Sequence, residues 1–343
     1  MSNRTKRILL TGATGIVGAE TFRQLRALKN VHVRAVSAHG SNAGIVCWPM
    51  GQSPAPAELI GPWDVVVHTA ASTRLNMNPE EAVQANVTST AALREVVGPC
   101  THLVHVSTAF ADGKCGSRES RDLGDYRNAY EWSKACAERI VIEQFSPVTI
   151  IRPPLIIGRR SDGYIARFTG FYTLLRAVIT GLAPLMVGQP DGYLELIPVD
   201  DVAAEIVKAC LGARPDVSRV VILGRGNLAM SVATTMSVGC EAINNWRTRH
   251  DATSLSLPPM ITPDRWERFL LPFARSHLSA RQLDVIEALS SFVPYLSIAA
   301  ALRPTIVIED VAAPLRRSVY FWAERNRVAA LRHPAPWVME RSR

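Results

Sequence analysis

Short, almost entirely apolar runs recur along the first half of the chain, and stretches of helical character separate most of them. A strand that is apolar throughout is buried on both faces, which is typical of parallel strands in a sheet covered by helices on both sides. The pattern therefore predicts an α/β fold with a doubly wound parallel sheet. The runs are residues 7–10, 31–36, 45–48, 64–69 (DVVVHT), 103–107 (LVHVS) and 148–151.

The second half of the chain has a different character. Residues 161–190 are rich in Gly, Phe, Tyr and Leu without a clear strand, and the pattern after Arg225 is mostly helical. We therefore expect a mainly helical cap beside the sheet domain. The predicted boundaries are 1–160 and 193–227 for the sheet domain, and 161–192 and 228–343 for the cap.

One aromatic stripe stands out in the predicted cap. Trp266, Phe269, Leu270 and Phe273 recur at i, i+3, i+4 and i+7. This spacing predicts one face of a helix, and we interpret the stripe as core packing.

A glycine-rich stretch, TGATGIVG (residues 11–18), follows the first apolar run. Gly12, Gly15 and Gly18 fall at a predicted strand-to-helix junction, where missing side chains let the backbone approach a pyrophosphate at the positive end of the helix. A tight turn that merely needs glycine is the alternative. The position between an N-terminal strand and an amphipathic helix favours a dinucleotide-binding loop.

The charges after the second predicted strand indicate which dinucleotide binds. An acidic residue there, roughly 20 residues after the glycines, would bind the ribose 2′-hydroxyl of NAD. The sequence has no acidic residue between Glu20 and Glu58, and instead offers Arg34, Ser37 and His39. These side chains tolerate a 2′-phosphate better, so we predict NADP(H) in preference to NAD.

A tyrosine and a lysine lie four residues apart in NAYEWSKACAE (residues 128–138). On a helix, Tyr130 and Lys134 share one face. A nearby cation lowers the pKa of a tyrosine, which would make Tyr130 a general acid near neutral pH. The motif alone is short and also occurs in incidental surface pairs, so other parts of the chain must support this interpretation.

The glycine loop, the alternating pattern and the Tyr130/Lys134 pair together resemble the extended branch of the short-chain dehydrogenase/reductase superfamily. Five further stretches are similar to motifs of that family, in the right order, so that the resemblance covers about residues 5–225. They are VVVHTAAS (65–72), ANVTST (85–90), VSTAFADG (106–113), IRPPLIIG (151–158) and IPVDDVA (197–203). The family's aspartate for the adenine is replaced here by CWPMG at residues 47–51.

The resemblance implies roles for individual residues. Tyr130 would exchange a proton with the substrate oxygen, Lys134 would lower its pKa and hold the nicotinamide ribose, and Thr108 would bond the same oxygen. Asn86 either completes a proton path or satisfies backbone at a helix irregularity, and we interpret His68 as structural. No metal site is implied. The implied cofactor-binding residues are Gly12, Thr14, Gly15, Ile16, Gly18, Arg34, Ser37, Ala70, Ala71, Lys134 and Pro153.

Two stretches resemble a particular subgroup, the fatty acyl reductases and thioester reductase domains. These are STAF at residues 107–110 and the loop-helix at residues 168–188. They imply NADPH-dependent reduction of an acyl thioester, carried by coenzyme A or a carrier protein, to an aldehyde or alcohol. The acyl chain would lie in a channel around Phe168, Phe171, Tyr172 and Leu174.

Two alternatives remain open. One is an epimerase, dehydratase or ketoreductase that acts on a sugar nucleotide, sterol or other small carbonyl with the same residues. The other is a non-catalytic dinucleotide sensor, although such proteins usually lose the tyrosine or the lysine and this chain keeps both.

The overall charge bears on partners. A net charge of +8 suits an acidic partner, such as cofactor phosphates, coenzyme A or an acidic acyl carrier protein. Lys and Arg are scattered among Asp and Glu without a basic block interleaved with aromatics, so nucleic-acid binding is not predicted. The oligomeric state stays open.

We expect a cytoplasmic protein without a membrane span. The stretch before the glycine loop is too short for a signal peptide, and the apolar residues 292–302 contain a proline and fall short of the ~20 residues that a span needs. The cysteines show no CxxC or metal-ligand spacing, which predicts reduced thiols. They are Cys47, Cys100, Cys115, Cys136, Cys210 and Cys240.

Overall fold

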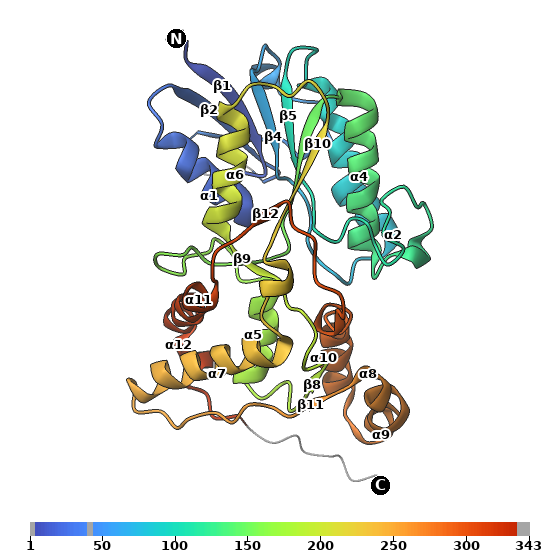
Figure 1. Cartoon of the computed structure of the whole chain (residues 1–343), viewed down its shortest axis with the longest axis vertical. Coiled ribbons are helices and arrows are strands. Elements are labelled where there is room, and N and C mark those ends of the chain that lie inside the picture. The colour runs from blue at the N-terminus through green and yellow to red at the C-terminus, as the bar shows by residue number, and fades with distance from the viewer. Residues whose placement is uncertain (1–3, 40–43, 335–343) are drawn as a thin grey trace. The chain divides into compact units, whose positions relative to one another are not determined.

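A computed structural model describes residues 4–39 and 44–334 of the chain, which divides into two compact units (Figure 1). The first unit contains Met1–Pro154, Val199–Gly224 and Pro304–Ile308. The second contains Leu155–Pro198, Arg225–Arg303 and Glu309–Arg343.

An eight-stranded sheet forms the centre of the first unit, with the strand order β12-β10-β6-β5-β4-β1-β2-β3. Its neighbouring strands pair in parallel. The order reverses between β1 and β4, so the predicted doubly wound sheet is confirmed. The strands are β1 (Lys6–Thr11), β2 (Val31–Ser37), β3 (Ile45–Cys47), β4 (Val65–His68), β5 (His102–Val106), β6 (Val148–Arg152), β10 (Arg219–Gly224) and β12 (Ile306–Val307).

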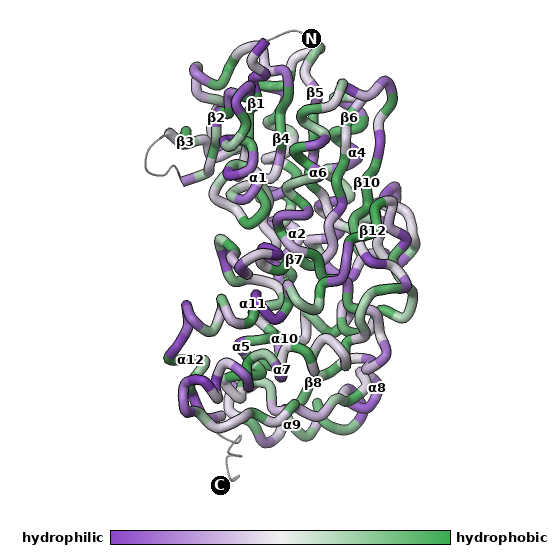
Figure 2. Tube along the Cα trace, turned by 60° about the vertical axis from the view of Figure 1, so that its left-hand side comes forward, coloured by the Kyte–Doolittle hydropathy of each residue, from purple (hydrophilic) through white to green (hydrophobic). Residues whose placement is uncertain are grey.

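Helices flank this sheet. α1 (Ile16–Arg26) packs against α6 (Val199–Leu211), whereas α4 (Ala129–Phe145) packs against an irregular helical segment. Figure 2 shows apolar residues concentrated along the central strands. The irregular segment consists of α2 (Pro79–Ala82), the π-helix η2 (Val83–Thr88), α3 (Ser89–Ala91) and the 3-10 helix η3 (Ala92–Glu95).

The second unit is mainly helical and contains two small two-stranded sheets. The strand pairs are β7 (Leu155–Ile157) with β9 (Leu196–Pro198), and β8 (Met186–Val187) with β11 (Met260–Ile261). The helices are α5 (Phe171–Ile179), α7 (Val232–Thr248), α8 (Pro263–Arg265), the π-helix η6 (Trp266–Leu270), α9 (Leu271–His277), α10 (Ala280–Ser290), α11 (Ala312–Arg325) and α12 (Arg327–Leu331).

Two details differ from what the sequence patterns indicated. The strand β12 lies in the first unit, although the predicted boundaries assigned residues 304–308 to the cap. The aromatic stripe is not a core face, because 69% of Phe269 and 47% of Phe273 are exposed. The π-helix η6 interrupts the 3.6-residue period on which that interpretation depended.

Within the described residues, none of the helices is long and apolar enough to cross a membrane. Among those same residues, no three His, Cys, Asp or Glu side chains are grouped so as to hold a metal ion.

Candidate active site

The glycine-rich loop connects β1 to α1 and lies tightly against the end of β4. Gly12 has a φ of +72°, and a Cβ there would lie 2.6 Å from the backbone nitrogen of Ala70. A Cβ on Gly18 would lie 2.1 Å from the carbonyl oxygen of Gly12. Only glycine fits at these two positions, so the sequence requires it for close approach of the backbone.

The N-terminus of α1 is suited to an anion. Gly15 is its N-cap residue, and this fully described helix has neither a capping side-chain hydrogen bond nor an acidic residue in its first turn. Its first N–H groups and its dipole therefore favour a phosphate group. The loop is therefore suited to the pyrophosphate of a dinucleotide, and binding at these glycines stays a prediction.

The end of β2 approaches the same loop. Thr14 Oγ1 lies 2.9 Å from Ser37 Oγ, and either hydroxyl can donate. Arg34, three residues before the strand ends, forms an ion pair with Glu58 of η1 (Ala57–Leu59). Glu58 bounds the stretch without acidic residues on which the cofactor prediction rests, and the fold brings it to Arg34 although it lies 24 positions further along the chain.

The remaining predicted cofactor residues lie at the carboxyl ends of other strands. Ala70 and Ala71 follow β4, and Pro153 follows β6, where its carbonyl oxygen accepts a hydrogen bond of 2.9 Å from the N–H of Ala109. In a doubly wound sheet, ligands bind at this edge where the strand order reverses. The structure thus brings the ends of β1, β2, β4 and β6 to one edge.

Thr108, Tyr130 and Lys134 also come together there. Thr108 follows β5 and is 4% exposed, while Lys134 on α4 is 2% exposed and donates a 2.8 Å hydrogen bond to the carbonyl oxygen of Val106. The Tyr130 phenol, partly buried, is hydrogen-bonded to the Thr108 hydroxyl. The burial excludes an incidental surface pair.

Local sequence sets where α4 begins and therefore where Tyr130 points. The side chain of Asn128 is the N-cap, and its Oδ1 accepts a 3.0 Å hydrogen bond from the N–H of Glu131. Such a cap is worth roughly 1 kcal/mol of helix stability. Tyr130 is consequently in the first turn and Lys134 one turn later, on the same face.

Burial dominates the ionisation of the pair. It raises the pKa of Tyr130 to about 12, opposed by the hydrogen bond with Thr108. It lowers the pKa of Lys134 to about 8, opposed by the negative charge of Glu138. The prediction that the Lys134 charge would bring the pKa of Tyr130 near neutral pH is therefore contradicted, because desolvation of the phenolate is the largest influence on this pKa and raises it.

Asn86 lies in the π-helix η2, and its side chain is fully engaged. Oδ1 accepts from the N–H of Ser72 at 2.7 Å, while Nδ2 donates to the Ser72 carbonyl at 3.1 Å and to Ser133 Oγ at 2.9 Å. These bonds satisfy the backbone of Ser72, which is one of the two roles that the sequence left open, and a proton path through Asn86 stays a prediction.

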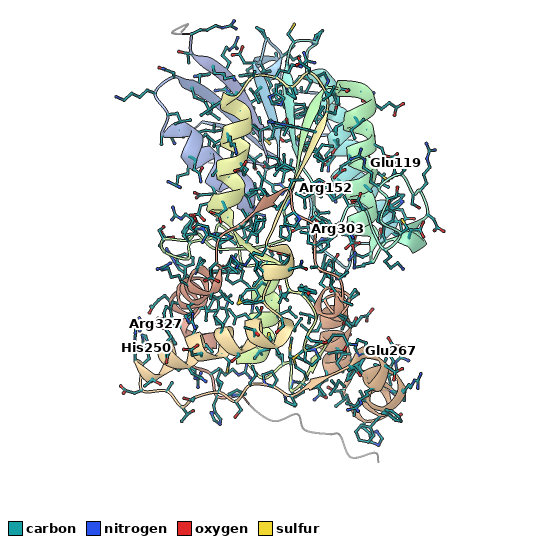
Figure 3. All side chains as sticks on the ribbon, viewed as in Figure 1. Glu119, Arg152, His250, Glu267, Arg303 and Arg327 are labelled. Atoms are coloured by element: carbon teal, nitrogen blue, oxygen red, sulfur yellow. The ribbon has the colours of Figure 1, made fainter. Side chains whose placement is uncertain are left out.

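Sequence reasoning missed an ion cluster around Arg152, a residue that Figure 3 labels. Arg152, at the end of β6, bonds both carboxylate oxygens of Glu138 on α4, at 2.8 and 2.7 Å. It also bonds Asp112 in the loop after β5, at 2.6 and 3.0 Å. The cluster ties together the elements that carry Thr108 and Lys134. The sequence signal that could have revealed the cluster is Arg152 itself, an arginine at the end of an otherwise largely apolar strand.

Similarity to known proteins agrees with this geometry. The family model described as male sterility protein matches residues 52–206. Peramine synthetase ppzA of Metarhizium majus (strain ARSEF 297) is 24% identical over 67% of this chain. Fatty acyl-CoA reductase 1 of Gallus gallus is 27% identical over 43% of it. The chain spans only 10% and 36% of the lengths of these two proteins.

Solved structures share the fold. The terminal R domain from the myxalamid PKS-NRPS biosynthetic pathway has a TM-score of 0.66 at 19% identity, covering 98% of this chain and 94% of that one. UDP-glucuronic acid 4-epimerase from Bacillus cereus, in complex with NAD, has a TM-score of 0.56 at 16% identity and covers 93% and 99%. The predicted resemblance to extended short-chain dehydrogenases/reductases, and to the acyl reductase subgroup in particular, is confirmed.

Proposed function

We propose that this NAD(P)-dependent oxidoreductase of the extended short-chain dehydrogenase/reductase class reduces an acyl thioester, with NADPH as the hydride donor. Thr108, Tyr130 and Lys134 would act at the thioester carbonyl. The aldehyde and the free thiol are the first products, and a second hydride would convert the aldehyde to an alcohol.

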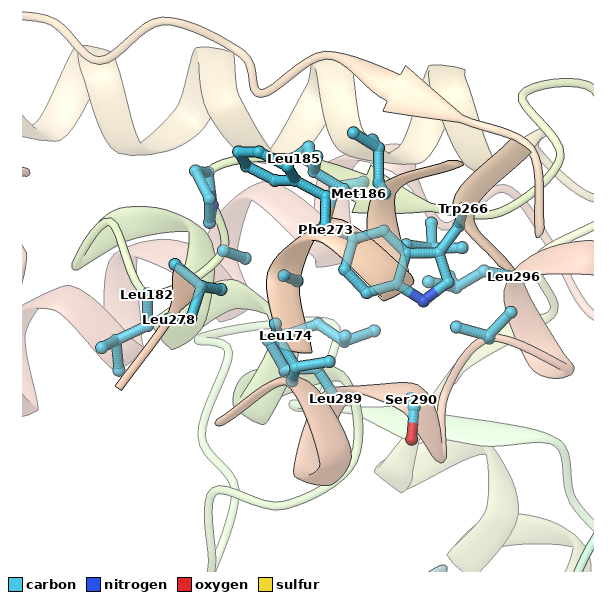
Figure 4. A pocket seen from close by; sticks show the side chains of 17 residues that line it. Leu174, Leu182, Leu185, Met186, Trp266, Phe273, Leu278, Leu289, Ser290 and Leu296 are labelled. Atoms are coloured by element: carbon cyan, nitrogen blue, oxygen red, sulfur yellow. The ribbon is translucent and has the colours of Figure 1, made fainter. Parts of the chain in front are cut away.

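An apolar cavity in the second unit is the observation that carries this proposal (Figure 4). It has a volume of about 300 Å³, and among the described residues that line it only Ser290 is polar. A sugar nucleotide, with its hydroxyls and diphosphate, would lose hydrogen bonds to water there without compensation. A hydrocarbon chain suits such a lining.

The cavity differs from the acyl channel that the sequence suggested. Of the four residues expected to surround the chain, only Leu174 lines it. Tyr172 is 1% exposed, and its hydroxyl accepts a 2.9 Å hydrogen bond from the N–H of Gly158. Phe171 is also buried, whereas Phe168 packs edge-on against Tyr172 at 5.1 Å. The rest of the lining comes from residues 182–187, which include β8, from η6, α9 and α10, and from residues that follow α9 and α10.

The chain's own residues support the chemistry in two ways. When bound, the nicotinamide supplies hydride to the carbonyl carbon. Tyr130 and Thr108 would donate hydrogen bonds to the carbonyl oxygen, where negative charge develops in the transition state. Collapse of the resulting oxyanion breaks the carbon–sulfur bond, and the thiolate takes up a proton. Lys134, an ammonium below about pH 8, favours negative charge beside it.

The preference for NADPH is part of the proposal. No acidic side chain ends β2, and Ser37 lies at the loop that would hold the phosphates. Glu58 neutralises Arg34, so we assign the tolerance of a 2′-phosphate mainly to Ser37 and His39. Calorimetric titration is expected to show tighter binding of NADPH than of NADH. Equal affinities for NADPH and NADH would refute the proposed preference for NADPH.

The main experiment follows thiol release and NADPH oxidation together. We expect one free thiol per NADPH consumed if reduction stops at the aldehyde, and one per two NADPH if it continues to the alcohol. The substrates are acyl-coenzyme A or an acyl carrier protein, the latter an acidic partner that suits a net charge of +8. Tyr130→Phe and Lys134→Met should lower turnover at least a hundredfold, in the range of general acid catalysis. Turnover of a ketone or sugar nucleotide with no thioester consumed would instead establish the alternative function.

Tyr126→Phe is a matched control for Tyr130→Phe. Tyr126 is buried in the same region, but its hydroxyl donates to the carbonyl oxygen of Ser120 at 2.9 Å and not to Thr108. We expect this variant to keep the activity of the parent protein.

A further inference from the structure

His68 links two parts of the first unit that the sequence gives no reason to connect. Its ring is 1% exposed, at the carboxyl end of β4. Nδ1 lies 2.8 Å from the hydroxyl of Thr11, which begins the glycine-rich stretch. Nε2 lies 3.2 Å from the hydroxyl of Thr90 on α3.

The surroundings define the direction of these hydrogen bonds. Thr90 Oγ1 lies 2.6 Å from the carbonyl oxygen of Asn86, to which it donates its single proton. His68 Nε2 must therefore donate to Thr90, and Nδ1 accepts from Thr11. Burial, with the Lys134 charge as a second cause, lowers the pKa of His68 to about 3 and keeps this neutral form.

The chain of hydrogen bonds continues to the catalytic helix. The Asn86 carbonyl lies in the π-helix η2, and the side chain of the same residue donates to Ser133 Oγ at 2.9 Å. Ser133 Oγ in turn donates to the backbone carbonyl of Tyr130 at 2.8 Å. Thr11 at the glycine loop is thus connected to the first turn of α4 through His68, Thr90, Asn86 and Ser133.

We propose that His68 is a positioning residue, which holds Asn86 and Ser133 through Thr90 and so fixes the first turn of α4 relative to the glycine loop. It touches neither substrate nor cofactor in this role. The consequence is a defined position of the Tyr130 phenol, on which proton transfer depends steeply. The expected effect on kcat rests on the proposed function, whereas the expected effect on amide hydrogen exchange does not.

A matched buried pair on the same sheet provides the control. His102 Nε2 lies 2.9 Å from Thr149 Oγ1, and both side chains are buried. This pair lies near the amino ends of β5 and β6, away from the edge that carries the site. Removing the Thr149 hydroxyl removes this buried His–Thr hydrogen bond and a 3.1 Å bond that the hydroxyl accepts from Arg219 Nε. It breaks none of the hydrogen bonds that connect Thr11 to α4.

The experiment compares Thr90→Val, Thr90→Ser and Thr149→Val. We expect Thr90→Val to lower kcat about tenfold or more, as for a displaced catalytic group, while KM and the NADPH Kd change less than about twofold. Thr149→Val should lower the melting temperature similarly and leave kcat unchanged. Thr90→Ser, which restores the hydroxyl, should keep kcat near the parent value.

Amide hydrogen exchange tests the proposal without any substrate. Thr90→Val should speed exchange in residues 129–134, and Thr149→Val should not. Unchanged exchange there, or equal kcat in the two valine variants, overturns the positioning role. Tyr130→Phe run in parallel separates the two ideas: if it keeps full turnover, the proposed site fails, while the exchange result still decides the role of His68.

Discussion

At the scale of single residues, burial and not charge sets the behaviour of Tyr130 and Lys134. The phenol keeps its proton over the whole working range, since its pKa is raised to about 12. Lys134, whose pKa is lowered to about 8, changes charge within that range. The sequence identifies the pair by its spacing, but it contains no information on how strongly the fold desolvates each group.

The pH profile of the reaction follows from these values. Lysine is charged below its pKa, so the site loses its ammonium as the pH rises through about 8. We therefore expect kcat/KM for the thioester to fall above about pH 8, because this ratio reports the ionisation of the enzyme before the thioester binds. Steady-state rates with saturating NADPH measure it. A profile that stays flat until the tyrosine ionises would contradict the assignment to Lys134.

Two stacked histidines should respond in opposite ways to substitution. The rings of His68 and His105 lie 5.4 Å apart, and no described residue bonds either nitrogen of His105. Replacing an unsatisfied polar group with an apolar one of similar size is close to neutral or stabilising. We expect His105→Leu to keep or raise the free energy of unfolding, and His68→Leu to lower it by about 1–3 kcal/mol, since Thr11 and Thr90 lose their partner.

Urea denaturation at several pH values checks both variants. Burial lowers the pKa of each histidine in the folded state, so below pH 6.5 the unfolded chain binds more protons. Stability should thus fall with falling pH, by about 1.4 kcal/mol per pH unit for each buried histidine, until the folded pKa is reached. In His105→Leu, the free energy of unfolding should depend less steeply on pH, by the contribution of one histidine. An unchanged slope would show that His105 is not buried in neutral form.

At the scale of elements, short sequence patterns predict the strands and helices that depend on one stretch of the chain. The run at residues 7–10 lies within β1, and the Tyr130/Lys134 stretch lies on α4 as expected. The strand β12 has only two residues, too few to show a period. Arg152, Glu138 and Asp112 are 14 and 40 positions apart, so their cluster appears only when β6, α4 and the loop after β5 are assembled.

This cluster should matter more for stability than any exposed ion pair. Arg152→Met leaves the carboxylate of Glu138, which is 0% exposed, buried without its main partner. Breaking such a pair typically lowers the free energy of unfolding by about 3–5 kcal/mol. Denaturant titration of this variant should show a loss of that size.

Arg268→Met is the control for Arg152→Met. Arg268 and Asp264 form an exposed i,i+4 pair at 2.8 Å, and such pairs are worth about 0–1 kcal/mol. The double variant Arg152→Met/Glu138→Leu should be more stable than Arg152→Met, because no buried charge is left unpaired. Equal losses for Arg152→Met and Arg268→Met would mean that the cluster does not stabilise the fold.

At the scale of the whole molecule, the two units differed in how far the sequence predicts them. The apolar strands and the glycine loop define a doubly wound sheet because each strand carries its own signal. The cavity of the second unit has no such signal: its lining comes from residues 174–187, 266–278 and 286–296, brought together only by folding. The sequence predicts a core face for the aromatic stripe, because no local pattern identifies Trp266 and Phe273 as residues that line a cavity.

The cavity makes the chain length of the substrate the most informative variable. Each methylene that enters an apolar site contributes about 0.8 kcal/mol, or roughly a fourfold gain in kcat/KM. We expect kcat/KM to rise along a series of acyl-coenzyme A substrates and to level off once the cavity of about 300 Å³ is full.

Ala274→Phe, which places a ring in the cavity, should lower kcat/KM for long chains and leave that for short chains unchanged. Val328→Phe, at a side chain that is 91% exposed, adds similar bulk outside the cavity and should change neither. A series that is flat in the parent protein, or an Ala274→Phe variant that loses short and long substrates equally, would show that the acyl chain binds elsewhere.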